Sequence, residues 1–216
     1  MPPRSRTRTP PPSSIAEPIV EPRRVTGLLL AAGSGRRYGT PKALVDTGDG
    51  PWVLRALDAL AGCSSTTVVV GAAAPAVTAL IGDRSTVVVN PAFAGGMASS
   101  LAVGLSSVPG DVDAVLVMLV DLPDVSSAVV DRLSAAAGPH PRSTLVRASY
   151  AGLPGHPVLI GADHLGPFRA ALALGEPDAG GATYLRSHGV RLVECGDLAT
   201  GVDVDRPAGV PGALPE

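Results

Sequence analysis

The sequence contains very little lysine and few aromatic residues. Only one of its 17 basic residues is a lysine, Lys42, and the other 16 are arginines. Aromatic side chains make up 3% of the 216 residues, too few to build the stacking platforms that bind single-stranded nucleic acid. The formal net charge of −2 provides no overall attraction to nucleic acid or to a membrane surface. We therefore expect neither as a partner, and the composition favours a small ligand.

Cysteine is scarce as well, and long apolar runs are missing. Cys63 and Cys195 are far apart and neither has metal-ligand spacing around it, so neither a disulfide framework nor a zinc site is indicated. No apolar run reaches the roughly 18 residues of a membrane-spanning helix. We expect two buried, free thiols in a cytoplasmic protein without a membrane segment.

Apolar material is nevertheless ample, with 45% hydrophobic and 17% charged residues. The length suits a single domain. Residues 1–24 contain seven prolines and five arginines, a composition that cannot bury enough surface to fold. The sequence thus predicts a disordered tail over 1–24, one domain over 25–210 and a flexible C-terminus over 211–216.

Short β-branched runs alternate with Ala- and Leu-rich stretches of helical length, which is typical of α/β proteins. Several strands are apolar without alternation, as expected when helices cover both faces. We therefore predict a three-layer, Rossmann-like α/β fold on a mostly parallel sheet, with its ligand beyond the carboxyl ends of the strands. Strands are expected at 25–31, 66–71, 86–89, 114–120, 143–148 and 190–194, and helices at 52–61, 75–81, 97–105, 126–137, 165–174 and 180–188.

The first predicted strand leads directly into a glycine-rich, cationic loop at residues 33–42. Its three glycines let backbone N–H groups approach a ligand, and its cations add positive charge, so the loop is suited to hold an anion. A dinucleotide fingerprint would need glycine where Tyr38 stands, and a Walker loop would need glycine where Pro41 stands. The loop is therefore an anion cradle of another kind.

Residues 30–42, LAAGSGRRYGTPK, resemble the signature L-A-[AG]-G-x-[SG]-x-R-M-G-x-x-K of the nucleotidyltransferases that activate molybdenum cofactor, the MobA-like family, and of related sugar-phosphate nucleotidyltransferases. Tyr38 replaces the usual Met. The resemblance implies catalytic roles for Arg37 and Lys42. It also implies that the nucleotide is bound by Leu30, Ala31, Ala32, Gly33, Gly35, Arg37 and Lys42.

Acidic residues in two further segments extend the resemblance. Asp121 in D-L-P closes an apolar strand and is similar to the family aspartate that reaches Mg²⁺, an ion that prefers carboxylate and phosphate oxygens. The segment V-D-V-D-R-P at 202–207 is similar to the family motif D-[IV]-D-T-P, which implies Asp203 as a second metal ligand and leaves Asp205 as the alternative. Asp121 would then be both catalytic and a metal ligand. The alternatives are that Asp121 caps the following helix and that Asp203 is part of a solvated edge.

Two loops bear on the branch of the family. G-L-P-G-H-P-V at 152–158 resembles a segment of the molybdenum cofactor cytidylyltransferases, which implies that His156, in a rigid loop, binds the acceptor substrate; a turn histidine is the alternative. The loop 90–100 resembles a family loop that places Asn90 and Ser100 at the nucleotide, although Ser100 also suits a helix cap. Residues 178–182 resemble a further motif but carry Ala182 where the family has Arg.

Together these resemblances imply a Mg²⁺-dependent enzyme that transfers CMP from CTP to the terminal phosphate of molybdenum cofactor and releases pyrophosphate. Ala32 favours cytosine, because the guanylyl branch has glycine there. The expected partners are CTP, a molybdopterin-type acceptor and, transiently, a molybdoenzyme or its chaperone. A guanylyl- or other nucleotidyltransferase for a different phosphorylated acceptor, such as a sugar phosphate or phospholactate, and a non-catalytic cofactor-binding chaperone remain as alternatives.

Overall fold

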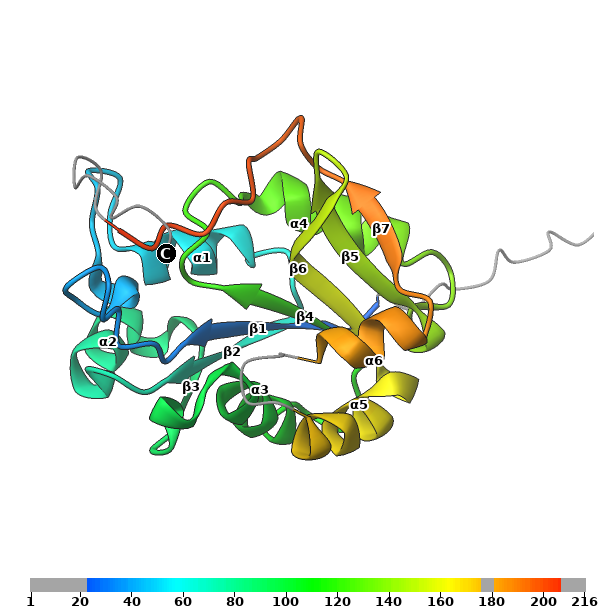
Figure 1. Cartoon of the computed structure of the whole chain (residues 1–216), viewed down its shortest axis with the longest axis horizontal. Helices are drawn as coiled ribbons and strands as arrows, with labels where there is room; N and C mark the ends of the chain where they lie inside the picture. Colours follow the sequence, from blue (N-terminus) through cyan, green and yellow to red (C-terminus); the bar gives the residue numbers. More distant parts are fainter. Residues whose placement is uncertain (1–22, 176–180, 207–216) are drawn as a thin grey trace, which may run out of the picture.

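The strands form one seven-stranded sheet in the order β3-β2-β1-β4-β6-β5-β7 (Figure 1). The computed structural model describes residues 23–175 and 181–206. Only β6 runs antiparallel to its neighbours, and the other pairings are parallel, which confirms the mostly parallel sheet. The strands are β1 (Val25–Ala31), β2 (Ser65–Val70), β3 (Thr86–Val89), β4 (Ala114–Leu119), β5 (Leu145–Tyr150), β6 (Leu153–Gly161) and β7 (Arg191–Glu194).

Helices cover both faces of the sheet and give the expected three layers. Figure 1 shows α1 and α4 on one side and α3, α5 and α6 on the other, and the buried side chains divide into two cores accordingly, with α2 on the side of α1. The helices are α1 (Trp52–Ala59), α2 (Ala74–Ile81), α3 (Met97–Ser106), α4 (Ser127–Ala136), α5 (Ala162–Leu174) and α6 (Ala182–Ser187), with 3-10 turns η1 (Lys42–Leu44), η2 (Gly82–Arg84), η3 (Phe93–Gly95) and η4 (Pro141–Ser143).

The central strand β1 is buried along its whole length. Successive side chains of a strand point to opposite faces, so Leu29 joins the core under α1 whereas Leu28 joins the core under α3. Gly104 lets α3 approach this strand closely, because a Cβ there would lie 2.6 Å from Leu28. The close approach brings the start of α3 beside the loop that follows β1.

The antiparallel strand β6 is absent from the sequence-based expectation, and the prediction that His156 lies in a rigid loop is wrong, since His156 is within β6. Ala151 and Gly152, with φ of 51° and 79°, form the two-residue connection of a β5–β6 hairpin, where positive φ values match the twist of the strands. A register irregularity between Arg147 and Ser149 accompanies the proline-containing part of β6.

Other boundaries differ by a few residues. Helix α5 begins at Ala162, three residues before the expected start, and contains Pro167. The expected disordered tail and flexible C-terminus lie outside the described residues, apart from Arg23 and Arg24; the backbone N–H of Arg24 donates to Asp113 Oδ2 over 3.0 Å.

The remaining structural expectations concern thiols and membranes. Both cysteines are free; Cys195 is buried, and burial raises the pKa of the half-buried Cys63 to about 11. None of the helices in the described part of the chain has the length and apolar character needed to cross a membrane.

Candidate active site

A cleft of about 460 Å³ lies at the carboxyl ends of β1 and β4, the edge where the sequence places the ligand. The loop after β1, the start of α3, the end of β4 and the segment after β7 form its walls. Ala31 and Asn90 are not among its lining residues. The residues singled out in the sequence that do line it are Leu30, Ala32, Gly33, Gly35, Arg37, Lys42, Ser100 and Asp121, and Asp205 joins them.

The loop after β1 folds tightly around Gly35. This residue has a φ of +60°, and a Cβ on it would lie 1.9 Å from the carbonyl oxygen of Thr40, so only glycine fits. Its carbonyl oxygen accepts hydrogen bonds from the backbone N–H groups of Tyr38 and Gly39, at 2.9 and 2.8 Å. Tyr38, at the position where the family usually has Met, packs edge-on against Trp52 with ring centroids 5.5 Å apart. This turn returns the chain so that Lys42 faces the cleft.

Lys42 is the centre of an ion-pair network. Its Nζ donates to Asp121 Oδ2 at 2.8 Å and to Asp205 Oδ1 at 2.6 Å, and its side chain is only 13% exposed. Burial lowers the pKa of Lys42, but the two carboxylates outweigh burial and the net pKa is raised. The hydrogen bond from Lys42 is also the main cause of the lowered pKa of Asp205, to which Arg37 adds a contact of 3.3 Å. Both partners are thus charged at neutral pH.

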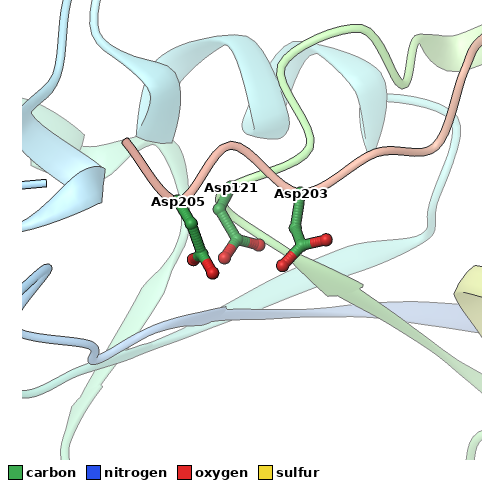
Figure 2. A group of neighbouring side chains, drawn as sticks. All are labelled: Asp121, Asp203 and Asp205. Atoms are coloured by element: carbon green, nitrogen blue, oxygen red, sulfur yellow. The ribbon is translucent and has the colours of Figure 1, made fainter. Parts of the chain in front are cut away.

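Three carboxylates meet at this point. Figure 2 shows the side chains of Asp203 and Asp205 beside that of Asp121, and one oxygen from each lies within 4.8 Å of the others. Asp121 Oδ1 is buried and accepts no hydrogen bond from the described residues, so it is free for a cation. Hard divalent ions such as Mg²⁺ and Mn²⁺ prefer carboxylate oxygens. The cluster therefore fits a divalent metal, and Asp121 is not the helix cap considered above, since α4 has no side-chain cap.

The segment after β7 brings the last two of these carboxylates to the site. It crosses back over the sheet toward the carboxyl end of β1 (Figure 1). The backbone N–H of Val204 donates to the carbonyl oxygen of Asp121 at 3.0 Å, and Thr200 donates through its backbone N–H and its hydroxyl to Asp124 Oδ2 at 2.6 and 2.5 Å. Val204 packs against the core, while its neighbours Asp203 and Asp205 bring their carboxylates next to that of Asp121. Of these two, Asp205 lines the cleft and Asp203 does not. Because side chains alternate in direction along this segment, Asp203 and Asp205 lie on the same side, next to Asp121.

Asn90 sits behind the cleft instead of in its wall. It is 1% exposed, and its amide is hydrogen-bonded within the protein. Nδ2 donates to the hydroxyls of Ser99 and Ser100 at 2.7 and 3.0 Å, and Oδ1 accepts from the N–H of Ala92 at 2.9 Å. Asn90 therefore positions the loop that carries Ser100, and direct contact of Asn90 with a nucleotide stays a prediction.

A second cavity, of about 190 Å³, lies on the α3, α5 and α6 side of the sheet and shares Leu30 and Met97 with the cleft. It contains His156, whose pKa is lowered to about 4 by burial and, secondarily, by the charge of Arg147. The imidazole is consequently neutral at pH 7. Arg147, from β5, also lines this cavity. Arg147 could not be predicted as a cavity residue from the sequence, because an isolated arginine in a strand belongs to no motif.

A cluster of carboxylates that fits a divalent metal, together with a cationic glycine loop at this edge of a parallel sheet, is typical of one class, the α/β enzymes that act on nucleotide phosphates. The family model of the MobA-like NTP transferase domain matches residues 27–192. The chain belongs to this family of nucleotidyltransferases.

Relatives with known structures agree with that membership. The chain is 25% identical to a nucleotidyl transferase from Methanothermobacter, with a TM-score of 0.70 over 85% of this chain and 92% of that one. It is 30% identical to Mycobacterium tuberculosis Rv0371C, solved as a complex with manganese, with a TM-score of 0.66 over 84% of this chain and 94% of that one.

A relative with a different kind of name is also similar. The chain is 37% identical over 194 residues to nicotine blue oxidoreductase from Paenarthrobacter nicotinovorans, an alignment that covers 84% of this chain and 92% of that protein. The chain is thus similar to proteins whose names describe different reactions.

Proposed function

We propose that the protein transfers CMP from CTP to the terminal phosphate of a molybdopterin-type acceptor, with Mg²⁺ as the cofactor and pyrophosphate as the second product. The observation that carries this proposal is the junction of Lys42 with Asp121 at the mouth of the glycine loop. Asp121 Oδ1, a buried carboxylate oxygen without a hydrogen-bond partner among the described residues, supplies a place for a cation beside a cleft that is lined by three basic side chains, Arg36, Arg37 and Lys42.

Two groups of side chains would neutralise the negative charge of the triphosphate, one through a bound metal and the other directly. Asp121 and Asp203 would hold the metal, which neutralises phosphate charge when bound. Asp205 is already engaged by Lys42 and Arg37, so its role is to hold these cations at the cleft, where they face the phosphates. Nucleotidyl transfer requires little more than positioning and charge neutralisation, which this set of residues can provide.

The reaction needs no side-chain base. An oxygen of the acceptor phosphate is already ionised at neutral pH and forms the new bond to the α-phosphorus, while the bond from that phosphorus to pyrophosphate breaks. Backbone N–H groups of Gly33 and Gly35 would bind the departing charge. His156 is neutral and donates or accepts a hydrogen bond on the acceptor side.

The preference for cytosine is proposed from Ala32. Its side chain is 4% exposed and lines the cleft, so its methyl group takes space that a larger purine would use. Ser100, in the first turn of α3, also lines the cleft, where its hydroxyl can form a hydrogen bond with the nucleotide. We place the enzyme in the cytoplasm, in transient contact with a molybdoenzyme or its chaperone.

One assay tests the proposal. Full-length protein is incubated with molybdenum cofactor, Mg²⁺ or Mn²⁺ and each of the four ribonucleoside triphosphates, and pyrophosphate release is followed. We expect release with CTP that depends on both the metal and the acceptor. Pyrophosphate release with a sugar phosphate or phospholactate in place of the cofactor would show that the enzyme uses a different acceptor. Binding of the cofactor without any pyrophosphate release would favour a cofactor-binding chaperone.

A second candidate, oxidation or reduction of a compound like nicotine blue, is supported by the 37% identity to nicotine blue oxidoreductase. It requires a hydride donor, and the loop after β1 lacks the dinucleotide fingerprint, with Tyr38 in place of its third glycine. Consumption of reduced nicotinamide cofactor in the presence of nicotine blue, with no pyrophosphate release in the assay above, would favour this candidate.

A further inference from the structure

The loop after β4 carries a second aspartate, Asp124, three residues after Asp121. Its carboxylate belongs neither to the lining of the cleft nor to the carboxylate cluster. Oδ2 accepts two hydrogen bonds from Thr200, one from the backbone N–H at 2.6 Å and one from the hydroxyl at 2.5 Å. Oδ1 is buried and accepts no hydrogen bond from the described residues. In the described part of the chain, Thr200 is therefore the one hydrogen-bond partner of this carboxylate.

A half-buried carboxylate such as that of Asp124 needs a physical reason for its position. Removal from water raises the free energy of a charged group, and an oxygen without a partner adds to that cost. A helix cap would be the ordinary reason for an aspartate here, but α4 receives no hydrogen bond from a capping side chain. The two bonds with Thr200 are what this carboxylate contributes, and hydrogen bonds to a charged acceptor are among the stronger ones.

Two ties join the loop after β4 to the segment after β7. Thr200 is bonded to Asp124, and the backbone N–H of Val204 donates to the carbonyl oxygen of Asp121 at 3.0 Å. The two stretches run in opposite directions, because the later residue of the loop meets the earlier residue of the segment. Asp203 lies between the two ties, and the other aspartate of the segment directly follows the second tie. The ties thus fix the stretch that supplies carboxylates to the cluster.

The turn that follows Thr200 is fixed by packing as well. Gly201 has a φ of +64°, and a Cβ on it would overlap the ring of Tyr150, so only glycine lets the backbone lie against this ring. The hydroxyl of Thr200 donates to Asp124 and also accepts from the backbone N–H of Val202 at 3.4 Å. The Thr200 side chain is therefore the point from which the segment turns toward the cluster.

We propose that Asp124 is a positioning residue for the metal site. Through Thr200 it holds the segment after β7 in place, so that the two aspartates of that segment meet Asp121. The effect of Asp124 on the ion is indirect, because its carboxylate lies outside the cluster. This inference rests on the proposed function for the role of the cluster in binding a divalent ion. Its consequence is that the affinity for the ion depends on two hydrogen bonds that do not touch it.

Binding of Mn²⁺ alone to full-length protein tests the proposal without turnover, and loss of the electron paramagnetic resonance signal of the free ion measures it. Asp124→Ala removes both hydrogen bonds and should weaken Mn²⁺ binding about 10- to 100-fold, the usual effect of losing hydrogen bonds to a charged group. Thr200→Val keeps the shape and removes only the hydroxyl, so it should weaken binding less. Thr200→Ser restores the hydroxyl and should bind Mn²⁺ as the wild type does.

The double variant that combines Asp124→Ala with Thr200→Val adds a test of coupling. It should bind Mn²⁺ no more weakly than Asp124→Ala alone, because both substitutions break the same contact. A merely structural role of Asp124 would lower the stability to urea and leave the Mn²⁺ affinity of the folded protein unchanged. The KM for CTP at saturating Mg²⁺ should stay at the wild-type value, since Asp124 lies outside the cleft.

The matched control lies earlier on the same segment. Asp197 accepts hydrogen bonds from both terminal nitrogens of Arg132 on α4. Asp197→Asn weakens this contact, which precedes both ties, and the variant should bind Mn²⁺ as tightly as the wild type.

Two results would overturn the positioning role, namely wild-type Mn²⁺ affinity in Asp124→Ala, or binding by Thr200→Ser as weak as that by Thr200→Val. The Thr200 variants keep the test decisive if Asp124→Ala does not fold. A wild type that binds no Mn²⁺ overturns the proposal as well. Mn²⁺ binding that depends on Asp124 and Thr200 in a protein that releases no pyrophosphate would support the positioning role and remove the proposed transfer reaction, so the two failures are distinguishable.

Discussion

The Nζ of Lys42 donates a hydrogen bond to Oδ2 of Asp121 across 2.8 Å, although 79 residues separate the two in the sequence. One residue ends the loop after β1 and the other follows β4, and these strands are neighbours in the sheet. The pairing of adjacent parallel strands therefore brings a cation and the carboxylate proposed to bind the metal to one point. The network also ties the glycine loop to the segment after β7 through Asp205.

Replacement of Lys42 tests the charge at the centre of this network. Lys42→Ala should lower turnover by about 10²- to 10³-fold, because one preorganised cation at a developing negative charge is lost. Steady-state pyrophosphate release measures the effect. Arg84→Ala, which removes an exposed cation paired with Asp58, serves as the control and should retain activity. Near-full turnover of Lys42→Ala would contradict the proposed cradle for phosphates.

Substitutions of the three aspartates should differ in their effect on the metal dependence of activity. Asp121→Asn should raise the Mg²⁺ concentration needed for half-maximal activity many-fold, because the substitution keeps the shape and removes the charge. Asp203→Asn should act in the same direction. Asp205→Asn should instead lower turnover at saturating metal, because its carboxylate holds Lys42 and Arg37. Titrations of activity with Mg²⁺ and Mn²⁺ measure both effects.

The exposed Asp111, which pairs with Arg24, provides the control for these titrations. Asp111→Asn should follow the wild-type curve. If Asp121→Asn also follows it, the metal is held elsewhere.

Base choice depends on Ala32. Discrimination from one methyl-sized clash should be about 10- to 200-fold, so Ala32→Gly should shift the ratio of kcat/KM for CTP and GTP toward GTP by at most that factor. The methyl group is buried at the cleft, and its removal leaves space on the nucleotide side. A wild-type enzyme that prefers GTP would refute the cytidylyl assignment and leave the transferase assignment in place.

Alanine substitutions of Gly35 and Gly33 test how the loop after β1 depends on glycine at each position. Gly35→Ala should lower the free energy of unfolding by more than about 1 kcal/mol, because the left-handed backbone and the contact with Thr40 both exclude a Cβ. Gly33→Ala should be tolerated, since a Cβ there meets nothing within 4 Å. Urea denaturation of both variants measures the difference, and equal stabilities would show that the loop is not built around Gly35.

The pH dependence of the free energy of unfolding should report the titration of the His156 imidazole. Its pKa is about 4 in the folded protein against an ordinary 6.5, so between these values the unfolded chain binds a proton that the folded chain does not. Stability is complete above pH 6.5 and falls as the pH is lowered toward 4, by about 2 kcal/mol at pH 5. His156→Gln should remove this loss, as seen by urea denaturation at pH 7 and pH 5. Identical pH profiles for wild type and variant would show that the imidazole titrates normally.

Strands with an unambiguous sequence pattern could be predicted with their correct bounds. The runs VTGLLLA and TVVV form β1 and β3 with the predicted ends. In β1 the reason is that aliphatic residues without charges suit a strand covered on both faces, whereas β3 lies at the exposed edge of the sheet and forms because β-branched residues favour extended backbone. β6 was missed because two prolines and a glycine in its first half, at Pro154, Gly155 and Pro157, are typical of loops. Its pairing with β4 and β5 outweighs this local preference.

The candidate site could be predicted in part for similar reasons. Lys42 and Asp121 lie in short motifs at strand ends, so their meeting follows from the parallel sheet. The pairing of Lys42 with Asp205 depends on the path of an irregular segment fixed by Thr200 and Val204, which no local pattern encodes. Arg147 lacks a motif altogether, and only the cavity around it sets it apart.

The position of the two aspartates outside the sheet has a consequence for proteolysis. All seven strands precede Asp203 and Asp205 in the sequence, so neither aspartate takes part in strand pairing. A chain clipped after β7 would retain Asp121 and Lys42 but lose the other two carboxylates of the cluster. Under the proposed mechanism such a chain would keep the strands of the sheet and lose activity, so that a single cut in an exposed segment would act as an off switch.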